Sequence, residues 1–153
     1  MSPDKRSPDE AKLDCFVGDW QNSGTVFPGP FGPGGPVTGE TNYHWDLGSK
    51  WLLYVSRLEL PGLGTYEVRG GVTYNQHANR YDAYAINNLG SLLVYEGEWT
   101  DDTNLVFTLV RPQPGGARVT YQEQPDGAIV MTSARASTDG SFETYFETSL
   151  TRE

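Results

Sequence analysis

The chain has 153 residues, 37% of them hydrophobic and 12% aromatic, with 18 glycines, 10 prolines and a formal net charge of −9 at pH 7. This composition excludes a disordered chain and, at this length, predicts a single domain over residues 1–153. Lysines and arginines form no cluster, so we expect neither nucleic acid nor a membrane surface as a partner, and the lone cysteine, Cys15, excludes an internal disulfide.

The N-terminal segment predicts a flexible start, residues 1–7, followed by a short helix. Ser7, Pro8 and Glu10 stand as an N-cap serine, a proline at the first helical position and a glutamate three residues after the cap. This pattern opens a helix over roughly 8–15. Its apolar edge, which could close one end of a barrel, consists of Leu13, Phe16 and Val17.

Ten segments in which apolar and polar residues alternate follow the helix, separated by residues typical of turns. They cover about 18–27, 37–45, 51–60, 65–74, 80–87, 92–100, 104–111, 117–122, 128–135 and 142–150. No connection is long enough for a crossover helix, so all can be hairpins. The predicted fold class is all-β: a single antiparallel meander β-barrel of about ten strands with a short N-terminal helix.

The Pro- and Gly-rich segment 28–36 can form neither a helix nor a paired strand. Two interpretations are open. The segment is either a lid over the barrel mouth, with Phe31 as an apolar latch, or a solvated connector.

Alternation also assigns the two faces of each strand, with the more apolar face inward. Glu143 and Glu147 alternate with Phe142 and Phe146, so both phenylalanines are predicted to point inward. The same rule predicts an inner face that includes Tyr43, Trp45, Tyr54, Tyr66, Tyr74, Tyr95, Trp99, Phe107, Tyr121 and Met131. A filled core and a ligand cavity both fit this lining, and the many tyrosine hydroxyls, which need partners when buried, favour the cavity.

Arg111, Glu123 and Arg135 are polar exceptions on the predicted inner face. An inward arginine is costly unless it is paired, and Glu123 could pair with either arginine. The arginines could instead bind a ligand carboxylate. Because both lie near strand ends, they could also be solvated charges at the rim.

Several motifs carry a resemblance to a known family: Leu13–Trp20, Asp46–Trp51, Gly70–Asn75, Arg80-Tyr81 and Gly97-Glu98-Trp99. With them the chain resembles an uncharacterised bacterial family, a domain of unknown function placed among calycin-like barrels beside lipocalins, fatty-acid-binding proteins and nitrobindins. The resemblance implies that the Trp20 ring closes the barrel floor. Where the family has a Trp-x-Asp-Ser-like run, this chain has Ala85-Ile86-Asn87-Asn88, and Ala83 and Ala85 would leave space on one face.

A nitrobindin-like barrel would need a histidine to bind haem iron. The histidines of this chain are His44, which alternation places outward, and His77, which falls in a turn. We therefore expect no haem and no other cofactor. Two histidines and one cysteine are also too few for a zinc site.

We expect the protein to bind a small hydrophobic or aromatic organic molecule inside the barrel, through the inner-face residues named above together with Phe31, Arg111 and Arg135. The alternative is a cofactor-independent enzyme, a cyclase or isomerase of a natural-product pathway. In that case Tyr54, Tyr95, Tyr121 and Glu123 would position and protonate the substrate.

The sequence leaves two oligomeric states open, a monomer or a homodimer. Residues 1–12 are polar and acidic, without the apolar core of a signal peptide, and no apolar run reaches the roughly 18 residues that span a bilayer. A cytoplasmic location is expected.

Overall fold

The computed structural model describes residues 6–30 and 32–153. Residues 1–5 of the expected flexible start and Phe31, the expected latch, lie outside the described residues. The described chain begins with helix α1 (Pro8–Ala11), which continues as a 3-10 helix (Lys12–Phe16). The strands follow in the order β1 (Gly18–Val26), β2 (Gly35–Asp46), β3 (Trp51–Leu60), β4 (Gly64–Asn75), β5 (Arg80–Asn87), β6 (Leu92–Trp99), β7 (Asn104–Arg111), β8 (Ala117–Glu123), β9 (Ile129–Ala136) and β10 (Phe142–Arg152).

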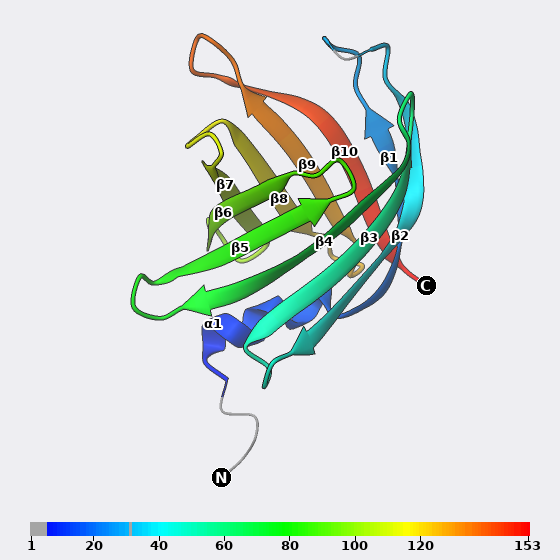
Figure 1. Ribbon diagram of the computed structural model, residues 1–153. Helices are drawn as coiled ribbons and strands as arrows, with labels where there is room; N and C mark the ends of the chain where they lie inside the picture. Colours follow the sequence, from blue (N-terminus) through cyan, green and yellow to red (C-terminus); the bar gives the residue numbers. More distant parts are fainter. Residues whose placement is uncertain (1–5, 31) are drawn as a thin grey trace.

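Each strand pairs antiparallel with the next strand along the chain, and β1 also pairs with β10, so the sheet closes into a barrel (Figure 1). The all-β meander barrel expected from the sequence is therefore confirmed. A closed barrel abolishes sheet edges. The described strands thus offer no free edge to which a second chain could add a strand.

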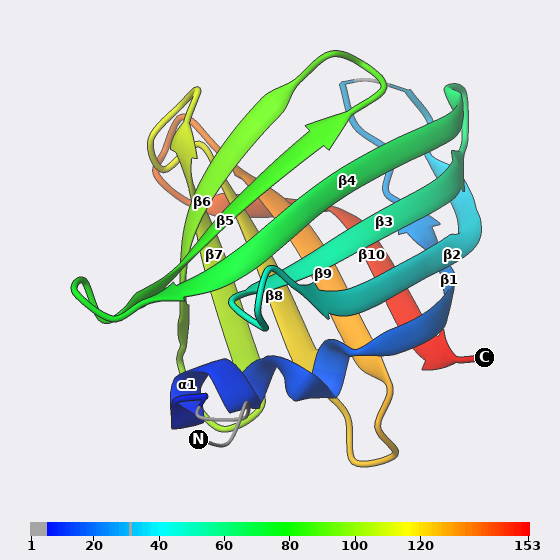
Figure 2. The same cartoon turned by 60° about the horizontal axis from the view of Figure 1, so that its bottom comes forward.

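The two ends of the barrel differ. The helical segment 8–16 lies across one end, which we call the plug end (Figure 2). The β2–β3, β4–β5, β6–β7 and β8–β9 turns are also at this end. The opposite end, which we call the open end, carries the other five connections, including the β1–β2 loop.

A capping box fixes the start of the plug, as its sequence predicts. The Ser7 hydroxyl accepts a hydrogen bond from the Glu10 N–H (3.1 Å), and the Glu10 carboxylate accepts one from the Ser7 N–H (2.9 Å). Lys50 of the β2–β3 turn places its Nζ 3.4 Å from the same buried carboxylate. Ser7 is thus held by specific contacts. No helix in the described part of the chain is long and apolar enough to cross a membrane.

Most of the hydrophobic core lies near the plug end. Leu13 and Phe16 of the plug are buried against Trp20, Tyr43, Leu52, Val72, Tyr81, Leu105, Phe107, Ile129 and Leu150. Burying side chains of this size stabilises a fold by about 1.5–3 kcal/mol each before entropy is counted. A smaller cluster nearer the open end consists of Val37, Leu58 and Phe146. The plug end is therefore the closed part of the barrel.

A β-bulge in β10 changes the face assignment at the open end. The register between β10 and β9 shifts between Thr144 and Phe146. Phe146 points inward as predicted, but the extra residue turns Phe142 outward, where its ring lies 4.1 Å below the Arg118 guanidinium. The prediction of an inward Phe142 is wrong because alternation cannot reveal a bulge.

Candidate ligand site

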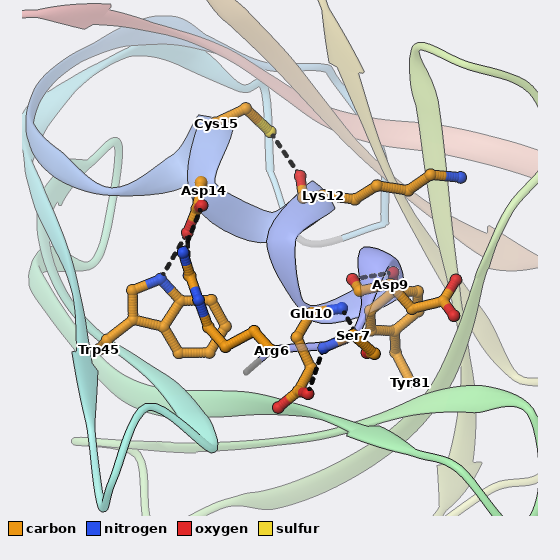
Figure 3. A network of polar contacts seen from close by, with 9 residues as sticks. All are labelled: Arg6, Ser7, Asp9, Glu10, Lys12, Asp14, Cys15, Trp45 and Tyr81. Carbon is orange, nitrogen blue, oxygen red and sulfur yellow. Dashed lines mark hydrogen bonds and ion pairs between the residues drawn. The ribbon is translucent and has the colours of Figure 1, made fainter. Parts of the chain in front are cut away.

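Three indole and phenol groups predicted to contact a ligand instead hold or border the plug, and Figure 3 shows one of them, Trp45. Trp45 donates a hydrogen bond from Nε1 to the Asp14 carboxylate (2.8 Å), which also accepts one from Arg6 Nη2 (3.0 Å). The Arg6 hydrogen bonds hold the pKa of Asp14 below its usual value, and Trp45 adds to them against the opposing effect of burial. Trp45 therefore binds the plug.

Trp99 and Tyr74 lie at the plug end as well. Tyr81 donates from its hydroxyl to the Asp9 carbonyl (2.6 Å) and accepts a hydrogen bond from Trp99 Nε1 (3.1 Å). The Tyr74 ring stands 5.0 Å from the Tyr81 ring, centroid to centroid. These contacts use Trp45, Trp99 and Tyr74 for structure, and none of the three faces the open half of the barrel.

Trp20 closes the floor, as the family resemblance implies. Its side chain is fully buried, and its Nε1 donates to the Phe16 carbonyl (2.7 Å). Arg152 at the end of β10 covers the Trp20 ring at 4.1 Å and donates to the carbonyls of Val17 (2.6 Å) and Cys15 (3.1 Å).

A layer of aromatic rings lies above the plug. The Phe16 ring contacts Tyr43 (5.5 Å between centroids) and Tyr121 (5.4 Å), while Tyr43 contacts Tyr54 (5.2 Å) and Tyr121 contacts Phe107 (6.0 Å). A cavity of about 20 Å³ lies among these rings. This volume holds about one water molecule, so the enclosed floor of the barrel is packed and does not accommodate an organic ligand.

Toward the open end the interior is less filled. The inward residues Tyr54, Tyr95, Val119 and Tyr121 are only partly buried, although they belong to the inner face of the barrel. Ala83 is the cross-strand neighbour of Tyr95, on the inner face between Val72 and Tyr95 in register, and it too is only partly buried. The strand beside Tyr95 thus carries a small side chain on its inner face.

Tyr54 and Tyr95 carry hydroxyls in this less filled part of the interior. Among the described residues, neither hydroxyl has a hydrogen-bond partner in the protein. Within the described residues, Thr148 Oγ1 is the one side-chain polar atom that is sealed from water and has no hydrogen-bond partner. Tyr54 and Tyr95 therefore direct their hydroxyls into space that a water molecule can enter.

Two further tyrosines stand near these groups at the open end. The pKa of Tyr95 is raised by burial first and then by its neighbours Tyr145, Tyr121 and Tyr66, which places these phenols close together. Tyr66 accepts a hydrogen bond from Asn87 Nδ2 (3.0 Å). Sequence reasoning missed Tyr145 because the β10 bulge alone turns it toward this group.

Burial keeps the inner phenols protonated. It raises the pKa of Tyr43 and Tyr54 well above the ordinary value of tyrosine and raises that of Tyr121 in the same direction. Tyr43 and Tyr121 also interact with each other, which offsets part of the effect for Tyr121. As neutral phenols, these groups can donate hydrogen bonds to a bound molecule.

Other neutral polar groups line the β1–β3 side of the interior. The Thr41 hydroxyl donates to Asn22 Oδ1 (2.8 Å) and lies 2.8 Å from Ser56 Oγ.

Met131, predicted as a ligand contact, packs instead against the Val37, Leu58 and Phe146 cluster and the main core.

The two arginines occupy different places. Arg111 is exposed at the end of β7, and the prediction that it points inward is wrong, because a register shift between β6 and β7 pairs it with the outward Val94. Arg135 is partly buried near the open end, with its guanidinium 4.8 Å from the centre of the Tyr145 ring and with Glu143 opposite in register. Neither arginine is paired with Glu123, which lies at the other end of the barrel.

Glu123 is also far from Tyr95. Glu123 N–H donates to the carbonyl of Thr103, the residue just before β7 (2.8 Å), whereas Tyr95 pairs with Leu109 of β7, six residues farther along the chain. At about 3.4 Å per residue, the two are separated by roughly 20 Å along the strand. Glu123 is instead next to Cys15, whose pKa is raised to about 12 by burial and by this carboxylate. The four residues considered for catalysis do not form one site.

The histidines do not fit a haem iron inside the barrel. His44 is exposed on the outer face, with Nε2 4.0 Å from the Asp46 carboxylate, and His77 lies in the β4–β5 turn at the plug end. The described part of the chain also contains no group of three or more His, Cys, Asp or Glu side chains arranged to hold a metal ion.

A larger hollow, about 260 Å³, lies on the outer face of β1–β4. It is bordered by charged side chains, among them Asp19, Glu40 and the Arg57–Glu67 pair (3.3 Å). This hollow opens to solvent and lacks an apolar wall, so it does not match the ligand class expected from the aromatic interior.

Comparisons with known proteins identify a family and a fold. The family described as "Protein of unknown function (DUF1579)" matches residues 6–152. The crystal structure of Rv2717c from M. tuberculosis is similar with a TM-score of 0.72 and 13% identity, covering 96% of this chain and 98% of that chain. The search of curated proteins finds no match. The expected resemblance to a barrel family of unknown function is confirmed, and the structural likeness shows the shared fold.

Proposed function

The chain belongs to the DUF1579 family, whose function is unknown, and we propose that this protein binds a small hydrophobic or aromatic organic molecule in the open half of its barrel. The observation that carries the proposal is the pair of inner-face tyrosines, Tyr54 and Tyr95, whose hydroxyls have no hydrogen-bond partner among the described residues. An aromatic wall with a few convergent polar groups is typical of a ligand pocket.

The surface of the open end supports access for an apolar molecule. Its five loops, 27–34, 61–63, 88–91, 112–116 and 137–141, contain a single charged residue, Asp139, although the whole chain carries a net charge of −9. Phe27, Leu63 and Leu89 of these loops are exposed. An apolar molecule that approaches this end therefore displaces few strongly bound waters.

The geometry favours binding over catalysis. An enzyme of the kind considered above would bring a carboxylate and a phenol to the same substrate. Glu123 lies at the plug end beside Cys15, whereas Tyr95 faces the open half. A carrier or binding protein needs no such pair.

A solvatochromic dye tests the proposal. Nile red, an uncharged aromatic dye, is expected to bind the parent protein with increased and blue-shifted fluorescence. Ala83→Phe fills the inner wall beside Tyr95 and should weaken binding at least tenfold. Ile86→Phe, on the outer face of the same strand, is the matched control and should bind as the parent does. Equal binding by all three proteins, or none by the folded parent, would overturn the proposal.

A further inference from the structure

We infer that the ligand is an uncharged molecule with a hydrogen-bond acceptor, such as a ketone oxygen, and that the hydroxyls of Tyr54 and Tyr95 donate to this acceptor. The inference rests on the proposed function and adds the chemistry of the ligand's polar group. It comes from which polar groups the interior presents and which it lacks.

The interior presents donors. Tyr54 and Tyr95 have no hydrogen-bond partner among the described residues, and burial keeps both phenols protonated. An apolar ligand that covered these hydroxyls would leave them unpaired, which is costly in an apolar site. A ligand oxygen in front of them removes this cost, so the site discriminates against an analogue without the oxygen.

The interior lacks a cation beside Tyr54. Within residues 6–30 and 32–153, the lysines and arginines lie on the outer face, at the plug end or at the rim. Arg135 reaches the inner face near the open end, where its guanidinium lies against the ring of Tyr145, a neighbour of Tyr95, and Glu143 stands opposite it in register. A carboxylate beside Tyr54 would be removed from water without a positive partner, which is strongly unfavourable.

A cationic ligand fits no better. Two carboxylates belong to the inner face. Glu123 lies beside Cys15 at the plug end, several residues of strand away from Tyr95, and Glu143 stands at the open rim opposite Arg135 in register. A neutral acceptor is the group that these surroundings match.

Three probes of one shape separate the possibilities. 2-Acetylnaphthalene has a neutral acceptor, 2-ethylnaphthalene has none, and 2-naphthoate carries a charge. Dissociation constants come from NMR titration of the full chain. We expect 2-acetylnaphthalene to bind about five- to tenfold more tightly than 2-ethylnaphthalene, the factor that one net hydrogen bond supplies, and 2-naphthoate to bind most weakly.

Variants assign the difference to the two hydroxyls. Tyr54→Phe and Tyr95→Phe keep the rings and should bring the acetyl and ethyl probes closer together, whereas Tyr84→Phe on the outer face should preserve the preference. If either inner variant fails to fold, the relative affinities of the parent protein for the three probes still test the inference. Equal binding of the acetyl and ethyl probes, or tightest binding of 2-naphthoate, would overturn the inference while leaving the proposed function intact. Absence of binding by all three to the folded parent would overturn both.

Discussion

The phenol of Tyr54 lies across Gly70 on the neighbouring strand, so close that a Cβ atom on this glycine would stand 2.5 Å from the Tyr54 hydroxyl oxygen. The Phe107 ring covers Gly97 on β6 in the same manner, with a distance of 2.5 Å from Phe107 Cδ1 to such a Cβ. Aromatic side chains that cover a cross-strand glycine are a known device of curved sheets. Here the glycine fixes where the Tyr54 hydroxyl points.

Gly70→Ala is expected to destabilise the barrel by about 1–3 kcal/mol, the usual cost of overpacking. The added methyl group would meet the Tyr84 carbonyl at 2.4 Å as well as the Tyr54 ring. Urea unfolding followed by circular dichroism measures the change. Gly29→Ala, at a loop position with open space around it, is the control and should change the free energy of unfolding little. An unchanged free energy of unfolding in Gly70→Ala would show that the Tyr54 ring moves aside without cost.

Tyr81→Phe is expected to loosen the plug. The substitution removes the hydroxyl that donates to the Asp9 carbonyl, and it leaves Trp99 Nε1 without its acceptor. We expect a loss of about 1–3 kcal/mol in the free energy of unfolding. Tyr84→Phe, whose hydroxyl makes no hydrogen bond with a described residue, should lose much less. Equal effects of the two variants would contradict the role given to Tyr81.

Cys15 is expected to react slowly with thiol reagents in the folded protein. Burial and the neighbouring Glu123 carboxylate raise its pKa to about 12, so little thiolate is present near neutral pH. Reaction with Ellman's reagent at pH 8 should be at least about a hundredfold slower than in urea, where the thiol pKa is about 8.5. A native rate close to the unfolded rate would show that the plug opens readily.

Stability is expected to fall on the alkaline side. The folded-state pKa is raised to about 12 for Cys15 and for Tyr81, in both cases mainly by burial. Their unfolded values are about 8.5 and 10. The unfolded chain therefore releases these protons first, so the stabilisation is fully present below about pH 8.5 and is lost as pH rises toward 12. Urea midpoints from pH 7 to 11 check this.

Cys15→Ala provides the control for the pH series. The variant should lose the part of the decline that begins near pH 8.5 and retain the part that begins near pH 10, where the tyrosines titrate. A flat profile for the parent up to pH 11 would contradict the raised pKa values.

Much of the fold follows from local sequence. Alternation and turn residues predict the ten strands, and the Ser7–Glu10 capping box predicts the helix start, because both are properties of short segments. The bulge at Tyr145 is not encoded in the alternation of β10, so Phe142 was placed on the wrong face and Tyr145 was missed. The position of the inward side chains along the barrel axis is harder to predict than the strands. Trp45, Tyr74 and Trp99 do face inward, but their height in the barrel depends on strand tilt and stagger, which the sequence of one strand does not contain.

A crystal structure of the full chain with 2-acetylnaphthalene tests the central claim most directly. We predict density for the probe in the open half of the barrel, with its ketone oxygen within hydrogen-bond distance of the Tyr54 or Tyr95 hydroxyl and its rings facing Ala83. An interior filled by the protein's own side chains, with the probe on the outer surface, would contradict the account.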